Sequence, residues 1–319
     1  MSKIAVIGGG SFGTVIANII ALNGHDVQFW MRSSELVNEV NENQENNQYL
    51  PGYSLSKKVV ATANMADAVT KASLIFVAVP SSSFREVVKQ IVVFAPDDAM
   101  LISTTKGIEP GNFKLMSQVL HEESPSSGIG VLSGPNLAKE IASKHPTGTV
   151  IASNNEQIRE TVKDVLRSDT FRVYTNDDMF GIELGGSLKN IYAIIAGLAA
   201  SIGTGHNTNS MLVTRALADM ARFGRELGAD PMTFLGLAGV GDLVVTCSTP
   251  LSRNYRIGQA LGEGLSIEQA LNEVDQVAEG VNTLKLVKEK ADELGVYMPL
   301  VKGLYRIIYD GQPINDIVS

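Results

Sequence analysis

Apolar and polar positions in the first 180 residues alternate in a way that predicts buried strands separated by amphipathic helices. Phe84, Val87, Val88 and Ile91 recur at helical spacing just after an apolar run that ends at Pro80. Such alternation predicts a doubly wound, mostly parallel α/β sheet. The apolar runs that we interpret as strands cover residues 3–7, 27–30, 73–79, 99–103, 128–133 and 147–152.

The second half of the chain loses these runs, and helical spacing dominates it. We predict helices at residues 188–200, 210–227, 266–272, 283–294 and 300–309. A length of 319 residues favours two domains, since a single core seldom grows that large. We therefore predict an α/β domain over residues 1–185 and an all-α domain over residues 186–319. The polar stretch at 38–48 is typical of a surface helix or loop.

A glycine pattern follows the first predicted strand. Gly8, Gly10 and Gly13 fit G-x-G-x-x-G between a strand and a helix. The first glycine permits a tight turn, the second lets the backbone approach a pyrophosphate, and the third lets helix and strand pack closely. The N–H groups at the start of the helix then bind the phosphate charge. The pattern predicts a Rossmann-type dinucleotide site.

The end of the second strand bears on the choice of dinucleotide. An Asp or Glu at this place binds the ribose 2′-hydroxyl of NAD, but here the chain continues as Trp30-Met31-Arg32. A guanidinium suits a 2′-phosphate, so Arg32 favours NADP over NAD. A solvated arginine with no role in binding is the alternative.

Lys189 lies in a segment that is otherwise almost without charge, directly after Gly185 and Gly186. We expect a buried helix that begins after these glycines, with the ammonium near the positive end of the helix dipole. Desolvation and the dipole would both lower its pKa and suit it to proton transfer. The alternative is a structural lysine that reaches solvent or pairs with a carboxylate.

Composition narrows the function classes. A net charge of −8 without a basic cluster argues against binding to nucleic acid or to an anionic membrane. No apolar run reaches the length of a membrane span. The single cysteine, Cys247, excludes an internal disulfide and is consistent with the reducing cytoplasm. Cys247, His145 and His206 lack the spacing of a metal site, so we expect no metal.

The order and spacing of several short motifs resemble the NAD(P)-dependent glycerol-3-phosphate dehydrogenases of the bacterial type. The resemblance covers essentially the whole chain. Its motifs are GGGSFGT at 8–14, YLPG at 49–52, TKGIE at 105–109, SGP at 133–135, AKE at 138–140, LKN at 188–190, GVGDL at 239–243, TC at 246–247, SRN at 252–254 and EG at 279–280.

This resemblance implies interconversion of glycerol 3-phosphate and dihydroxyacetone phosphate with NAD(P), and a supply of glycerol 3-phosphate for phospholipid synthesis. It implies that Lys189 is the catalytic acid and base. The substrate site implied by position comprises Lys106, Gly134, Asn136, Lys189, Asn190, Asp242, Thr246, Ser252, Arg253 and Asn254. The cofactor site comprises Gly8, Gly10, Ser11, Phe12, Gly13, Arg32, Phe84, Lys106, Ala138, Arg253, Val277 and Glu279.

Within this scheme, Asp242 would orient the Lys189 ammonium, Arg253 would bind the substrate phosphate, and Lys106 would add a cation from the first domain. Asn136 departs from the family, which commonly has Ser or Thr there, and Ala278 departs from a Val-Glu-Gly run.

Other interpretations remain open at this point. Asp242 could be a helix cap, and residues 252–254 a polar turn. A β-hydroxyacid dehydrogenase and a non-catalytic NADPH sensor are the alternative functions, and a homodimer is one option for the assembly.

Overall fold

The computed structural model describes residues 3–125, 127–274 and 279–314. The chain forms two compact units. Unit 1 comprises residues 1–105 and 116–179, and unit 2 comprises residues 106–115 and 180–319. The predicted division after residue 185 differs from this, because it lies six residues later and assigns residues 106–115 to the first domain.

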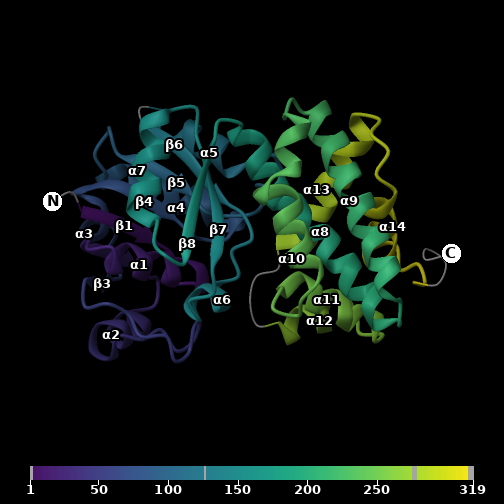
Figure 1. Cartoon of the computed structure of the whole chain (residues 1–319), viewed down its shortest axis with the longest axis horizontal. Coiled ribbons are helices and arrows are strands. Elements are labelled where there is room, and N and C mark those ends of the chain that lie inside the picture. The colour runs from purple at the N-terminus through teal and green to yellow at the C-terminus, as the bar shows by residue number, and fades with distance from the viewer. Residues whose placement is uncertain (1–2, 126, 275–278, 315–319) are drawn as a thin grey trace. The chain divides into compact units, whose positions relative to one another are not determined.

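Unit 1 is an eight-stranded sheet in the order β3-β2-β1-β4-β5-β6-β7-β8, with helices between the strands (Figure 1). Its strands are β1 (Lys3–Ile7), β2 (Val27–Trp30), β3 (Val59–Thr62), β4 (Ala72–Val77), β5 (Met100–Ser103), β6 (Gly128–Ser133), β7 (Thr147–Ala152) and β8 (Phe171–Asn176). Its helices are α1 (Ser11–Leu22), α2 (Ser34–Asn43), α3 (Met65–Val69), α4 (Ser81–Phe94), α5 (Met116–Glu123), α6 (Ala138–Ala142) and α7 (Glu156–Leu166).

Both faces of this sheet are covered, which explains why its strands are apolar at nearly every position. Successive side chains of a strand point to opposite faces. Ile4 and Val6 of β1 accordingly belong to an apolar cluster with α1, α6 and α7, whereas Ala5 and Ile7 belong to one with α3, α4 and α5. The predicted α/β class with a Rossmann-type sheet is therefore confirmed for unit 1.

One pair of strands departs from the parallel arrangement. β6 and β7 are antiparallel, with Leu132 opposite Ile151. The connection between them, residues 134–146, contains the five-residue helix α6. The sequence interpretation also omitted β3 and β8, which lie at the two edges of the sheet.

Unit 2 is built on helices (Figure 1). They are α8 (Met179–Ser201), α9 (His206–Glu226), the 3₁₀ turn η1 (Pro231–Leu235), the π-helical turn η2 (Leu237–Gly241), α10 (Asp242–Cys247), α11 (Arg253–Gly262), α12 (Ile267–Glu273), α13 (Glu279–Glu293) and α14 (Pro299–Tyr309). Most of α8 is buried, including Leu188, Ile191 and Tyr192, so it forms the core of the unit. Within the described residues, no helix combines the length and the hydropathy that crossing a bilayer requires.

The glycines Gly185 and Gly186 lie within α8 and do not precede it. A Cβ on Gly185 would sit 3.1 Å from the carbonyl oxygen of Ala238 and 3.6 Å from the ring of Phe234. The glycine therefore permits close packing of η1 and η2 on the helix, at a small cost in helix propensity. The prediction that the helix begins after the glycines was wrong for this reason.

Residues 106–115 belong to unit 2 because their apolar side chains enter its core. Ile108 and Leu115 are each 1% exposed and form a short antiparallel bridge with one another. Phe113 contacts Phe223 of α9 edge to face, with ring centroids 6.0 Å apart. Lys106 is thus carried by the same unit as Lys189, and the prediction that it comes from the first domain was wrong.

Candidate active site

The glycine-rich turn after β1 has the geometry expected from its spacing. Gly8 has a φ of +122°, and a Cβ there would meet the carbonyl of Ala78. A Cβ on Gly13 would overlap the carbonyl oxygen of Gly8, so α1 can approach the turn this closely only with glycine. Around Gly10, by contrast, no atom lies within 4 Å of the place of a Cβ. The backbone there is open to a ligand.

The start of α1 has no capping side chain, a feature that it shares with α4 and α6 in unit 1. Ser33, Asn64 and Asn155 cap α2, α3 and α7 with side-chain oxygens, whereas α1 is preceded by Gly10 and has no side-chain cap. The first N–H groups of α1 are therefore not engaged by a capping side chain. An uncapped helix start beside an open glycine suits the pyrophosphate of a dinucleotide.

The other residues of unit 1 that were predicted to bind the cofactor differ in their position and in their exposure. Ser11 and Phe12 form the start of α1, where the Ser11 hydroxyl donates to the Tyr49 carbonyl at 2.9 Å. Arg32 is exposed, two residues beyond β2. Phe84 is 0% exposed in the apolar cluster under α4, so its ring is not available at the surface.

The turn after β6 brings together Gly134, Asn136 and the first residue of α6, Ala138. Gly134 has a φ of +137°. The Asn136 amide donates to the Thr149 hydroxyl at 2.9 Å, and this hydroxyl donates to the Ser133 carbonyl at 3.0 Å. Among the described residues, the Asn136 Oδ1 atom is buried without a hydrogen-bond partner. A polar atom in this state suits a ligand that donates to it.

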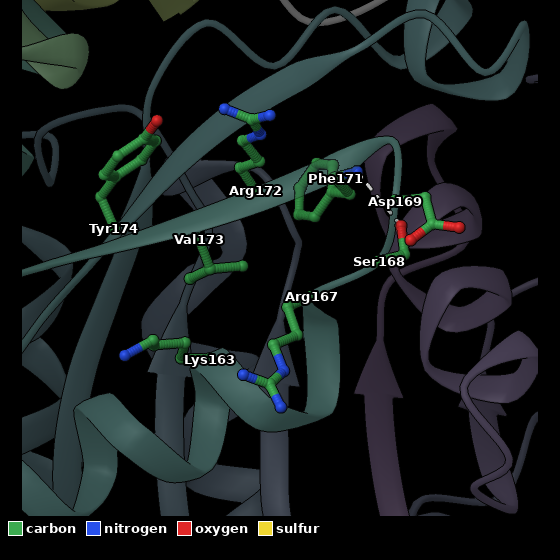
Figure 2. Close-up of a pocket in the computed structure, with 8 residues that line it drawn as sticks. All are labelled: Lys163, Arg167, Ser168, Asp169, Phe171, Arg172, Val173 and Tyr174. Carbon is green, nitrogen blue, oxygen red and sulfur yellow. Dashed lines mark hydrogen bonds between the residues drawn. The ribbon is translucent and has the colours of Figure 1, made fainter.

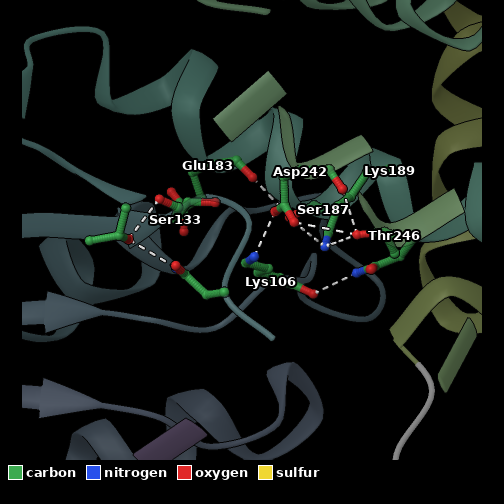
Figure 3. A network of polar contacts seen from close by, with 10 residues as sticks. Lys106, Ser133, Glu183, Ser187, Lys189, Asp242 and Thr246 are labelled. Carbon is green, nitrogen blue, oxygen red and sulfur yellow. Dashed lines mark hydrogen bonds and ion pairs between the residues drawn. The ribbon is translucent and has the colours of Figure 1, made fainter. Parts of the chain in front are cut away.

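Two lysines of unit 2 pair with one carboxylate, Asp242 (Figure 3). The Lys189 Nζ donates to Asp242 Oδ1 at 2.6 Å, and the Lys106 Nζ donates to Asp242 Oδ2 at 2.6 Å. Asp242 is 1% exposed, whereas the Lys106 side chain is 20% exposed. One buried carboxylate therefore holds two ammonium groups, and Asp242 does more than cap α10.

Thr246 completes the environment of Lys189. The Lys189 Nζ donates to the Thr246 hydroxyl at 2.6 Å, and this hydroxyl donates to the Asp242 backbone carbonyl one turn earlier. An ammonium has three N–H groups. Within the part of the chain that the structure describes, two of them have acceptors, Asp242 and Thr246. The third N–H has no acceptor among the described residues.

Burial lowers the pKa of Lys189 to about 8. Asp242 opposes this by stabilising the charge, and Lys106 reinforces it by repulsion. The lowered pKa was predicted correctly, but one of its two predicted causes was wrong. Lys189 lies in the middle of α8, far from the first turn, where the positive end of a helix dipole acts.

Asn190 and Asn254 form a second polar group beside the lysines. The Asn190 amide donates to the Lys106 carbonyl at 3.3 Å, and the Gly280 N–H donates to Asn254 Oδ1 at 3.1 Å. A Cβ on Gly280 would lie 2.7 Å from the Asn190 carbonyl oxygen. Gly280 was not among the predicted site residues, although the Glu-Gly motif at 279–280 marked the position.

Ser252, Arg253 and Asn254 start a helix and are not a free turn. The Ser252 hydroxyl accepts from the Tyr255 N–H at 3.3 Å and caps α11, whose first residue is Arg253. Arg253 as a whole is exposed. Desolvation of its guanidinium by the surrounding protein lowers the pKa of this group, and the negative charge of Glu279 acts to raise it. A cation at a helix start is well placed for a phosphate. Val277 lies outside the described residues.

The helices that carry Lys189 and Arg253 cross through glycines. A Cβ on Gly197 of α8 would overlap the Tyr255 carbonyl oxygen, and one on Gly258 of α11 would overlap the Ile194 carbonyl oxygen. The two helices therefore touch through their main chains at this crossing.

Two other features lie apart from this chemistry. A hollow of about 490 Å³ in unit 1 is lined in part by Lys163 of α7, by Arg167 just after that helix and by Arg172 of β8 (Figure 2). It contains none of the predicted site residues. Burial raises the pKa of Cys247 to about 12, which makes its thiol unreactive. The described residues contain no cluster of side chains able to hold a metal ion.

Comparison with known proteins identifies the same family over both units. Models of the NAD-dependent glycerol-3-phosphate dehydrogenase N-terminus and C-terminus match residues 3–159 and 178–319. Proteins named glycerol-3-phosphate dehydrogenase [NAD(P)+] from Alcanivorax borkumensis and Saccharophagus degradans are 56% and 54% identical to the chain, over 99% of it and over 92% and 88% of their own lengths. The crystal structure of glycerol-3-phosphate dehydrogenase from Coxiella burnetii matches with a TM-score of 0.95 and 36% identity, over 99% of this chain and 97% of that one.

Proposed function

Since the chain belongs to the NAD-dependent glycerol-3-phosphate dehydrogenase family, we propose that Lys189 is the proton donor and acceptor of its reaction. The enzyme interconverts glycerol 3-phosphate and dihydroxyacetone phosphate with NAD(P). The buried ammonium of Lys189, with one N–H left for a substrate, is the observation that carries the proposal.

The chemistry of the ketone explains the need for this group. A bound nicotinamide supplies the hydride in reduction and accepts it in oxidation. As hydride reaches C2 of the ketone, negative charge develops on its oxygen, and a proton from the Lys189 Nζ neutralises that charge. In the reverse direction the neutral amine takes the proton from the hydroxyl. A pKa of about 8 allows both states near neutral pH.

The neighbours of Lys189 would have distinct roles. Asp242 and Thr246 hold the ammonium in one orientation, and Asp242 keeps its pKa from falling further. Lys106 places a second positive charge on the same carboxylate, which favours an anionic substrate. We assign the phosphate to Arg253 and the neighbouring Asn254 at the start of α11.

The uncapped start of α1 and the open backbone at Gly10 would bind the pyrophosphate of the dinucleotide. We propose that NADP is preferred, because Arg32 follows β2 where a carboxylate would favour NAD. We also propose that the product serves phospholipid synthesis.

A substrate panel tests the function. The purified protein should oxidise NADPH, and NADH more slowly, with dihydroxyacetone phosphate as acceptor. Dihydroxyacetone and hydroxyacid or ketoacid substrates should react at less than about a hundredth of that rate, since they lack the phosphate group that Arg253 would bind. Equal rates with an unphosphorylated ketone or with a β-hydroxyacid would contradict the proposal.

A further inference from the structure

The segment that follows α2 packs against the glycine-rich turn through one buried side chain, Asn46. This residue is 0% exposed, although it lies in a stretch that the sequence indicated to be a surface helix or loop. Its Nδ2 donates to the Gly9 carbonyl at 2.8 Å and to the Thr14 hydroxyl at 2.8 Å. A backbone carbonyl can only accept, which fixes the amide NH₂ on this side.

Thr14 extends the contact by one more peptide. Its hydroxyl donates to the Gly10 carbonyl at 2.9 Å while it accepts from Asn46. The Ser11 hydroxyl adds a further link, to the carbonyl of Tyr49 in the same segment as Asn46. The carbonyls of two successive glycines are thus held by one network, directly by Asn46 and through Thr14.

The orientation of a carbonyl determines the orientation of the next N–H. A trans peptide is planar, so its C=O and N–H point in opposite directions. Holding the Gly9 carbonyl therefore orients the Gly10 N–H, and holding the Gly10 carbonyl orients the Ser11 N–H. Three consecutive glycines have little conformational preference of their own. The Gly10 carbonyl also accepts from the Thr14 N–H at 2.9 Å, so the Gly9–Gly10 peptide is the one that would be free to rotate without Asn46 and aim its N–H elsewhere.

We propose that Asn46 is a positioning residue that pre-organises the N–H groups of the glycine-rich turn for the pyrophosphate of the dinucleotide. The inference rests on the proposed function, because it presumes that a dinucleotide binds at this turn. Asn46 would act through the backbone, and its loss would weaken dinucleotide binding far more than it changes the rate of the chemical step.

The test compares Asn46→Ala with Asn41→Ala as a matched control. Asn41, near the end of α2, joins that helix to the sheet by two hydrogen bonds, to the carbonyl and the N–H of Ala61, and its side chain makes no hydrogen bond to the glycine-rich turn. The measurements are Kd for NADPH by titration, KM and kcat with dihydroxyacetone phosphate, and the thermal unfolding midpoint. Asn46→Ala should raise Kd and KM for NADPH about tenfold with kcat within about twofold, and Asn41→Ala should leave Kd within about twofold.

Thr14 provides a second test if Asn46→Ala folds poorly. Thr14→Val removes the hydroxyl and should also raise Kd for NADPH, whereas Thr14→Ser retains it and should restore binding. In the double variant with Asn46→Ala the two effects should be less than additive, because both break one network. Variants that lower the unfolding midpoint but bind NADPH as wild type does would overturn the inference alone. A wild-type protein that binds neither NADPH nor NADH would overturn the proposed function as well.

Discussion

The candidate site residues of the two units are of different kinds. In unit 1, the turn at Gly8 and Gly10 and the start of α1 present main-chain groups, and the side chains around them mostly hold the backbone in place. In unit 2, Lys106, Lys189 and Asp242 place ionised side chains in or beside a core. Ligand binding by main-chain groups depends on the conformation of the backbone. The pKa of a charged side chain depends on the balance between desolvation, which disfavours the charged form, and pairing with an opposite charge, which favours it. The two parts should therefore respond to mutation in different ways.

The largest expected effect is on the charged site. Lys189→Met should lower kcat by about a thousandfold, because the proton donor is lost. Its Kd for NADPH should stay within about twofold, since the backbone site is intact. The thermal midpoint should not fall, because a buried ammonium with a lowered pKa is itself unfavourable to the fold. Lys288→Met, which changes a partly exposed lysine paired with Asp292, is the control and should retain turnover. Turnover above a tenth of wild type in Lys189→Met would exclude the proton-transfer role.

Replacement of the phosphate-binding cation should have the next largest effect. Arg253→Ala should raise KM for dihydroxyacetone phosphate roughly 10- to 100-fold, the range for a hydrogen bond to a charged group. The slow reaction with dihydroxyacetone should change little. Arg256→Ala changes an exposed arginine on the same helix and should affect neither substrate. A similar loss with both substrates in Arg253→Ala would mean that Arg253 supports the fold and does not bind the phosphate.

The pH dependence of the reaction rate tests whether Lys189 is the proton donor and acceptor. Reduction needs the ammonium, so the single-turnover rate of reduction should fall about tenfold from pH 7 to pH 9 as Lys189 loses its proton near pH 8. The rate of oxidation should rise over the same interval. Asp242→Asn removes a group that raises the pKa of Lys189, so the midpoint should shift below 8. Asp292→Asn, on the surface of unit 2, should leave the midpoint in place. A rate of reduction that is flat across this interval would contradict the assignment.

The smallest expected effect is on the preference for NADPH over NADH, which we attribute to Arg32 of unit 1. Arg32→Ala should reduce the preference for NADPH over NADH about fivefold, because an exposed ion pair contributes modestly. Arg172→Ala removes another exposed arginine of unit 1, on β8, and should leave the ratio of the two KM values unchanged. An unchanged ratio in Arg32→Ala would remove the basis for preferring NADP.

The same contrast explains what the sequence could predict. Glycine spacing led directly to the turn at Gly8, Gly10 and Gly13, because only that residue fits a φ of +122° or a main-chain contact as close as the one at Gly13. Local pattern also predicted β1, β2 and the amphipathic helix after Pro80. In these cases the information is contained within a few neighbouring residues.

The features that sequence reasoning missed depend on distant contacts. Lys106 was assigned to the first domain because it follows a strand, whereas Ile108 and Leu115 carry its segment into the core of unit 2. The glycines in α8 suggested a helix start, but the close approach of Ala238 explains Gly185. Asn46 resembled its polar neighbours, and only the folded chain shows that its amide is buried. The residues next to a position in the sequence do not indicate which distant residues it will contact in the folded chain.

The crossing of α8 and α11 at Gly197 and Gly258 bears on substrate size. Because the two helices meet main chain to main chain, the separation between the backbones that carry Lys189 and Arg253 is set by this contact and does not depend on how nearby side chains pack. We therefore expect changes in chain-length selectivity to require substitutions at the crossing, where adding even one methyl group would move both helices apart.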